Sequence, residues 1–143
     1  MSEFFELLQR LRKSSRITLS SFHQGPRQQG AYILWLDNNP PVCLKVGIAG
    51  PRKGEGLRGR LQLHFSSNPD NTVLARHMEA DRDSVQAQRH DFRDREQRQQ
   101  FLANECFFQA IPLPNWTREE LRRFENFLES RLSPRYKGRV SRI

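Results

Sequence analysis

Three cationic or titratable side chains are the residues best suited to chemistry in this sequence. Lys45 interrupts the apolar run from Val42 to Ile48, and local inconsistencies of this kind are commonest at functional sites. Arg60 and His64 are four residues apart in a predicted helix, which places them one turn apart on the same face. A guanidinium stays protonated and offers parallel donors, and an imidazole can transfer a proton near neutral pH. These residue types suit the recognition and reaction of a phosphate group.

Composition also favours a polyanionic partner. The chain has 143 residues, a formal net charge of +8 and a pI near 10.5. Arginine far outnumbers lysine, and the guanidinium fork can hold a phosphate in a bidentate way. Charge alone does not separate DNA, RNA and an acidic membrane, and a solvated basic surface is the simpler alternative. The length fits one domain, from residue 1 to residue 143.

Membrane and secretory segments are not expected. No apolar run approaches the roughly 18 residues of a membrane span, and the N-terminus lacks the basic start and apolar centre of a secretory signal. Cys43 and Cys106 each fall in a predicted strand and form no CxxC pair. We therefore expect two buried, reduced cysteines in a cytoplasmic protein.

Three strands are predicted to carry the candidate side chains. Ala31–Leu36 and Val42–Ile48 flank a turn-forming Asn-Pro segment and should form an antiparallel hairpin, and Glu105–Leu113 is a third strand. Alternation places Tyr32 and Leu34 on one face of the first strand. In the second strand, it places Lys45 on one face with Cys43 and Gly47, and Leu44 with Val46 on the other.

Helices are predicted around this sheet. An amphipathic helix over Phe4–Leu11 should pack on the core, and Leu57–Phe65 should form the basic helix. Residues 14–29 should be a loop, with a short strand near Ile17. Thr72–Asn104 is helical in pattern and mixes acidic and basic residues, which is typical of a solvated, ion-paired helix. A capping box at Thr117–Glu120 opens a helix to about Leu132, and its apolar stripe has Glu125 beside it.

These motifs occur in an order that resembles the GIY-YIG nuclease superfamily. Gly30-Ala31-Tyr32 matches the first signature tripeptide, and Lys45-Val46-Gly47 is a degenerate form of the second. The run of Leu57, Arg60 and His64 is similar to the family's following helix. Glu125 lies nine residues before Pro134-Arg135-Tyr136, as the family's metal-binding glutamate does before a similar segment. The resemblance covers about residues 29–137, with 66–104 as a longer helical insertion and 1–28 as an N-terminal extension.

The resemblance implies a role for each of these residues. Tyr32 would contact, and deprotonate, the attacking water, with Lys45 as the cation that lowers its pKa or as an alternative base. Arg60 would hold the scissile phosphate. His64 would orient a phosphate oxygen or the water, or share the proton transfer. Glu125 would bind one Mg²⁺ or Mn²⁺, with waters and phosphate completing the coordination shell.

Two departures from the family pattern weaken these assignments. The second signature normally begins with tyrosine, where this chain has Lys45, and a lysine there is similar to some restriction-enzyme members. The family's asparagine after the Pro-x-Tyr segment is replaced by Lys137. Four basic residues are further candidates for contacting nucleic acid: Arg52, Lys53, Arg58 and Lys137.

The sequence therefore predicts an α/β domain of the α+β type, with a small three-stranded antiparallel sheet flanked by helices. The expected function is metal-dependent endonucleolytic cleavage of nucleic acid, with DNA favoured over RNA. A catalytically silent nucleic-acid-binding module, or a subunit of a repair, restriction or defence complex, is the alternative. Because no separate DNA-reading domain is visible, specificity would come from residues 66–104, the N-terminal segment, a homodimer or a larger protein partner.

Overall fold

The computed structural model describes residues 2–50, 56–69 and 72–137. Within these ranges the chain forms the strands β1 (Gly30–Leu36), β2 (Val42–Ala49) and β3 (Cys106–Pro112). The helices are α1 (Ser2–Lys13), the 3₁₀ helix η1 (Leu19–Gln24), α2 (Gly56–Ser66), α3 (Val73–Ala80), α4 (Val85–Arg89), α5 (Arg95–Glu105) and α6 (Arg118–Leu132).

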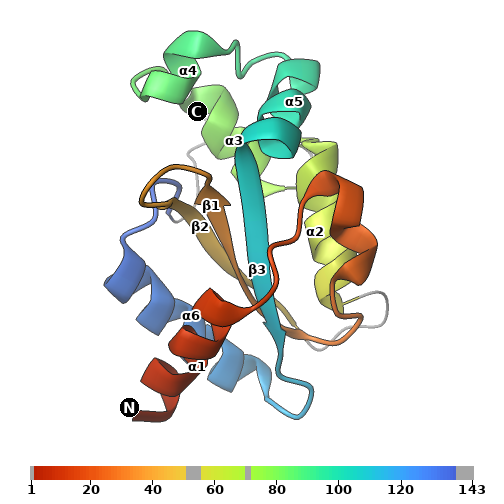
Figure 1. Ribbon diagram of the computed structural model, residues 1–143, viewed down its shortest axis with the longest axis vertical. Helices are drawn as coiled ribbons and strands as arrows, with labels where there is room; N and C mark the ends of the chain where they lie inside the picture. Colours follow the sequence, from red (N-terminus) through yellow and green to blue (C-terminus); the bar gives the residue numbers. More distant parts are fainter. Residues whose placement is uncertain (1, 51–55, 70–71, 138–143) are drawn as a thin grey trace.

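The three strands form one antiparallel sheet, as predicted, and their order in it is β2-β1-β3. The hairpin register pairs Tyr32 with Gly47, and β1 pairs along its whole length with β3. Helices cover both faces of the sheet (Figure 1). The α+β class expected from the sequence is confirmed.

Each face of the sheet has its own apolar core. On one face, Tyr32 and Leu34 pack with residues of α2, α3 and α5, including Leu61 and Phe101. On the other face, α1 and α6 pack over side chains such as Ile33, as their amphipathic patterns predict. β2 is the edge strand beside which α6 lies, so side chains from α2 and α6 can meet near its free edge.

The predicted alternation along β2 is wrong at one point. The register shifts between Leu34 and Trp35, so that Lys45 pairs with Leu34 while Cys43 pairs with Trp35. The extra residue, Leu44, packs in the core on the α2 face, and Cys43 packs on the opposite face. A β-bulge of this kind reverses the alternation beyond it. Lys45 and Gly47 therefore share the face of their partners on β1, without Cys43.

Residues 72–104 form three short helices where the pattern predicts one polar helical segment. Thr72, Ser84 and Asp94 each accept a backbone N–H of the following turn as N-caps, which explains the three starts. The segment is also less solvated than expected. Arg98 is buried, with its guanidinium donating to Ser67 and to the Phe92 carbonyl.

The N-terminal region agrees with the prediction in part. α1 buries Leu7, Leu8 and Leu11 as expected. The short strand predicted near Ile17 is reduced to a single bridge, in which Ile17 exchanges two 2.8 Å backbone hydrogen bonds with Phe108. The loop that follows contains the 3₁₀ helix η1, which packs against α2.

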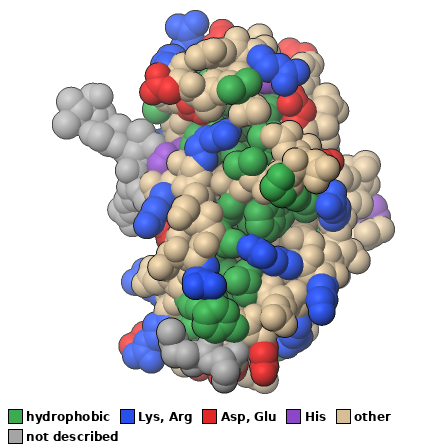
Figure 2. All heavy atoms as spheres, turned by 60° about the vertical axis from the view of Figure 1, so that its left-hand side comes forward, with side chains coloured by type: hydrophobic (Ala, Val, Ile, Leu, Met, Phe, Trp, Pro, Cys, Tyr) green, Lys and Arg blue, Asp and Glu red, His purple; other side chains and the backbone are tan. Residues whose placement is uncertain are grey.

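No helix among the described residues is long and apolar enough to cross a membrane. Cys43 and Cys106 are buried free thiols, as predicted, and burial raises the pKa of Cys43 to about 12. On one face of the molecule, apolar side chains gather in an irregular band, with Lys and Arg side chains beside it (Figure 2).

Candidate active site

The centre of the candidate site is a hydrogen bond between Tyr32 and His64. The phenol oxygen lies 2.6 Å from His64 Nε2, and both side chains are almost completely buried, at 2% and 3% exposure. Tyr32 extends from the middle strand and His64 from the last turn of α2, so the bond joins the sheet to the helix above it. The rings also pack against Phe108, which fixes both of them in place.

Gly47 makes room for the phenol. It is the cross-strand partner of Tyr32, and a Cβ at this position would overlap the Tyr32 hydroxyl and ring. The ring therefore lies directly against the backbone of β2. Glycine is needed here for space and not for an unusual backbone conformation.

Burial determines the protonation of this pair. It raises the pKa of Tyr32, against the opposing effect of Arg60, and the charge of Glu125 raises it further. Burial also holds the pKa of His64 well below 6.5, and the cations Lys45 and Arg60 act in the same direction. At neutral pH the pair is thus a protonated phenol beside a neutral imidazole.

His64 Nδ1 is the polar atom of this pair that lacks a partner. Nε2 contacts Tyr32, whereas the buried Nδ1 makes no hydrogen bond. Whether the phenol donates to Nε2 or accepts from it, one imidazole nitrogen stays buried without a partner, which carries a desolvation penalty. Most buried side-chain polar atoms in folded proteins have a partner, so this nitrogen is an exception.

The two predicted cations lie close to this pair. Lys45 is partly buried, and its pKa is lowered by burial in spite of the opposing effects of Glu125 and Glu129. Arg60, one turn before His64 on α2, is also partly buried. The charges of Lys45 and Arg60 both lower the pKa of His64, so both cations lie within electrostatic range of the imidazole.

Glu125 reaches the same group from α6. It is partly buried beside Phe124, on the flank of the helix's apolar stripe, where the sequence placed it. Burial and the neighbouring Glu129 raise its pKa, against the effects of Lys45, Arg122 and Arg118. The negative charge of Glu125 raises the pKa of Lys45 and that of the buried phenol of Tyr32.

The residues present fit a hard divalent cation held mainly by water. Glu125 and Glu129 are one helical turn apart, and no ion pair within 4.0 Å joins Glu125 to Lys45. A partly buried carboxylate repelled by a second one is stabilised by a nearby cation. Among the described residues there is no group of three His, Cys, Asp or Glu that could bind a metal. Two carboxylates on one helix face are hard oxygen donors of the kind that Mg²⁺ takes, since Mg²⁺ keeps most of its waters and needs few protein ligands.

The four further basic candidates are less well connected to this group. Arg58 Nε donates to the Gly25 carbonyl at 3.0 Å, so part of its guanidinium anchors the loop before β1. Lys137 is exposed and follows Tyr136, whose backbone N–H donates to Leu44 of β2. Arg52 and Lys53 lie outside the described residues.

Two members of this group were not predicted. The charge of Glu129 raises the pKa of both Lys45 and Glu125. Its spacing of four residues from Glu125 on a predicted helix was the sequence signal that could have identified it. Arg118, at the start of α6, lies beside Gly50, where a Cβ would be 3.2 Å from its guanidinium. No sequence signal connected Arg118 to the end of β2, because that contact depends on how α6 packs.

Comparison of the chain with protein families, curated proteins and solved structures gave no match.

Proposed function

We propose that this chain is a metal-dependent endonuclease of the GIY-YIG type that hydrolyses phosphodiester bonds, preferentially in DNA. The observation that supports this most is the 2.6 Å contact between Tyr32 and His64 in the field of Arg60 and Glu125. A phenol, an imidazole, a fixed cation and a carboxylate, each from a predicted position, are the groups that phosphodiester hydrolysis requires.

His64 makes Tyr32 a usable base. A buried phenol with a raised pKa removes a proton from water poorly by itself. A neutral imidazole at hydrogen-bond distance can accept the phenol proton at Nε2 while the phenol oxygen accepts a proton from the attacking water. The phenol is neutral before and after this relay, and His64 would hold the proton only transiently, because burial and the nearby cations lower its pKa. Lys45 is the alternative base, because burial lowers its pKa.

Arg60 and Glu125 would bind the scissile phosphate and the metal ion, respectively. Arg60 would hold the scissile phosphate and the charge that builds on it, since a guanidinium stays protonated and donates in parallel. Glu125 would hold Mg²⁺ through a carboxylate oxygen, with Glu129 adding negative charge behind it. When bound, the ion supplies Lewis-acid stabilisation of the phosphate and the leaving oxygen.

The test is nicking of supercoiled plasmid DNA by the purified protein in Mg²⁺, in Mn²⁺ and in EDTA. We expect cleavage in either metal and none in EDTA. Glu125→Gln should lower the nicking rate by about 100-fold or more, because it removes the negative ligand and keeps the size of the side chain. DNA binding without metal should be retained, since the substitution removes a negative charge that faces phosphate.

Glu119→Gln is the matched control. Glu119 is on the same helix, is exposed and pairs with Arg123 at 2.7 Å, so its loss changes net charge equally without touching the site. It should nick DNA as the wild type does. Equal activity of Glu125→Gln and wild type would overturn the proposed site.

A catalytically silent nucleic-acid-binding module is the second candidate, and Lys45 favours it. A lysine replaces the second signature tyrosine, and nothing in the site lowers the pKa of Tyr32 below its ordinary value. DNA affinity with a steep salt dependence, and no cleavage in either metal, would support this reading. The two reduced cysteines are consistent with a reducing compartment such as the cytoplasm.

A further inference from the structure

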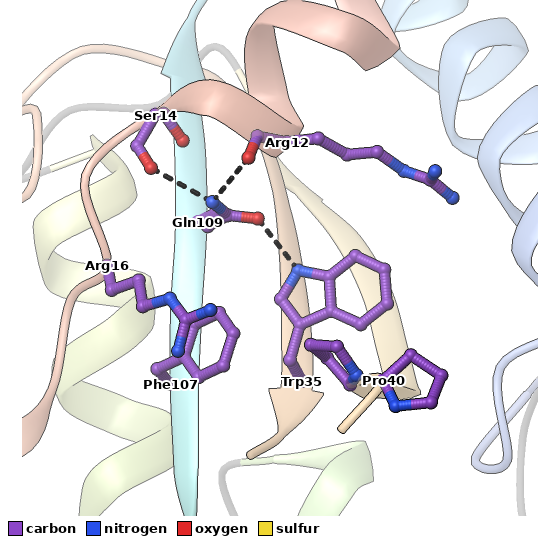
Figure 3. Close-up of a pocket in the computed structure, with 8 residues that line it drawn as sticks. Arg12, Ser14, Arg16, Trp35, Pro40, Phe107 and Gln109 are labelled. Atoms are coloured by element: carbon purple, nitrogen blue, oxygen red, sulfur yellow. Dashed lines mark hydrogen bonds between the residues drawn. The ribbon is translucent and has the colours of Figure 1, made fainter. Parts of the chain in front are cut away.

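A pocket of about 420 Å³ opens on the sheet face opposite the Tyr32–His64 pair. Its walls combine two guanidiniums, two aromatic rings and two prolines (Figure 3). We call it the Trp35 pocket, and it is lined by Arg12, Ser14, Arg16, Trp35, Pro40, Pro41, Phe107 and Gln109. Its volume is within the range of small-ligand sites.

The sheet register fixes the aromatic wall. Trp35 and Phe107 are direct cross-strand partners on β1 and β3, so their rings project side by side. Pro40, from the turn after β1, lies below the indole in Figure 3. Because these groups come from paired strands and a proline-containing turn, the wall is held in place without a ligand.

Gln109 holds the indole of Trp35 in place through a hydrogen bond. Its Oε1 accepts the Trp35 Nε1–H at 2.9 Å, and its Nε2 donates to the backbone carbonyls of Arg12 and Ser14 at 3.0 and 2.9 Å (Figure 3). The amide is buried and uses its donors and its acceptor inside the protein. It therefore positions the pocket wall and is not itself available to a ligand.

The groups that remain available to a ligand are cationic. The Arg16 guanidinium lies 4.1 Å from the centre of the Phe107 ring, and that of Arg12 lies 5.9 Å from the centre of the Trp35 ring. The backbone bridge between Ile17 and Phe108 holds Arg16 at this place beside β3. Asp37 pairs with Arg16 at 3.4 Å, but both are exposed, so solvent screens this pair and a stronger acceptor can compete for the guanidinium.

These features select an anion with a flat apolar body. An inorganic anion would leave the indole and prolines without a contact, whereas an uncharged apolar ligand would leave two guanidiniums without an acceptor. A nucleotide meets both requirements, since its base can stack on aromatic and proline surfaces and its phosphate matches the guanidinium fork. The net charge of +8 favours such a ligand over a neutral one.

We propose that the Trp35 pocket binds one nucleotide, with its base against Pro40 and the exposed edge of Trp35 and its phosphate on Arg16. Arg12 lies on the other side of the indole and adds positive charge there (Figure 3). The nucleotide is either free or an unpaired unit of a nucleic-acid strand. This site is separate from the proposed nuclease centre, because it lies on the sheet face opposite the Tyr32–His64 pair and shares no residue with that centre.

The fluorescence of Trp35 can be used to measure binding in the pocket. The chain has two tryptophans, and Trp116 packs with Phe4 and Phe124 away from the pocket lining. In a Trp116→Phe protein, all tryptophan emission comes from Trp35. We expect saturable quenching on titration with 5′-AMP, with hexadeoxyadenylate, or with both. Saturation by 5′-AMP at an affinity equal to that of the oligonucleotide identifies a free nucleotide, and saturation by the oligonucleotide alone identifies a strand.

The double variant Arg12→Gln/Arg16→Gln should weaken this binding by about tenfold or more. Arg89→Gln/Arg123→Gln removes the same charge from exposed positions on α4 and α6 and should change it little. Arg60→Gln should impair nicking and leave the quenching intact, so failure of the nuclease proposal and failure of this one are distinguishable. No quenching by either probe, equal weakening in both double variants, or tighter binding of hexaglutamate would overturn the proposal.

Discussion

His64 has an environment that strongly favours a neutral imidazole. Its ring lies between Tyr32 and Phe108, and the charges of Lys45 and Arg60 oppose a further positive charge. Protonation would place that charge in a buried site without a compensating acceptor. At equilibrium the folded state therefore disfavours the imidazolium, while the unfolded chain accepts it freely.

This difference predicts how stability depends on pH. Because the pKa of His64 is near 6.5 in the unfolded chain and well below that in the folded one, only the unfolded state binds this proton as pH falls below 6.5. The free energy of unfolding is thus unaffected by His64 above about pH 7.5. It should fall by about 1 kcal/mol from pH 7 to pH 5.5. Urea unfolding of wild type and His64→Gln at several pH values measures this as a difference.

The difference between the two proteins isolates His64 from the other titrating groups. His64→Gln is less stable at pH 7, but its stability should fall less steeply as pH is lowered. Parallel curves for the two proteins over this interval would show that His64 accepts a proton in the folded state.

The sequence identified Tyr32, His64 and Glu125 because their spacing in predicted elements is periodic and short motifs mark them. It could not reveal that Tyr32 bonds to His64 and not to Lys45. That contact depends on the angle at which α2 crosses the sheet, and periodicity contains no information on crossing angles. The Trp35 pocket could not be predicted either, since the loop after α1 is held beside β3 by the Ile17–Phe108 bridge and by hydrogen bonds from Gln109, which leave no periodic signal.

At the scale of elements, two glycines bring β2 and α2 close to their neighbours. Gly47 lets the Tyr32 ring lie on β2. Gly56, at the start of α2, has φ of +58°, and a Cβ there would overlap the carbonyl oxygens of Arg27 and Gln28. Those carbonyls belong to the loop whose Gln28 oxygen accepts the Leu57 backbone N–H at 2.9 Å. The first turn of α2 is therefore held against the loop before β1.

Gly47→Ala tests how tightly β2 and Tyr32 are packed. The new methyl group would meet the rigid phenol, so we expect a loss of about 1–3 kcal/mol in the free energy of unfolding. Nicking activity should fall with it, because Tyr32 must move away from His64. Urea denaturation and the plasmid assay measure the two effects.

Gly50→Ala is the companion variant. Among the residues that the structure describes, its methyl group would meet the end of the flexible Arg118 side chain, at 3.2 Å, and that side chain can move aside. Stability and nicking should change little. A Gly47→Ala protein as stable as Gly50→Ala would show that Tyr32 has room to adjust.

The sheet and its flanking helices were predictable because their apolar periodicities are strong. The division of residues 72–104 into three short helices was not predictable. The polar composition of that segment suggested solvent exposure. The structure instead uses Phe92, Phe101 and Arg98 to pack it on α2. A buried arginine bonded to a distant backbone carbonyl leaves no periodic signal in the sequence.

At the scale of the whole molecule, the segment after α6 joins parts of the chain that are far apart in sequence. The backbone N–H groups of Arg135 and Tyr136 donate to the carbonyls of Cys43 and Leu44, at the bulge in β2. The Tyr136 hydroxyl donates to Asp81 Oδ2 at 2.6 Å, between α3 and α4. The Tyr136 ring packs in the core that also contains Tyr32. One residue thus connects the edge strand, the insertion and the end of α6.

Tyr136→Phe should therefore destabilise the molecule as a unit. The substitution keeps the buried ring and removes the donor to a carboxylate, a bond of about 1.5–3 kcal/mol. Tyr136 and Ser84 both lower the pKa of Asp81, so the bonded carboxylate stabilises the fold above its ordinary pKa of 3.8. This contribution is lost as pH falls through the lower folded pKa.

We expect urea transitions followed by far-UV circular dichroism and by tryptophan fluorescence to shift together at pH 7. Arg135→Gln, which loses a part-buried hydrogen bond between two side chains, to Gln86, should shift them less. If the dichroism transition of Tyr136→Phe preceded the fluorescence transition, residues 66–105 would be a separately melting unit and not part of one cooperative domain.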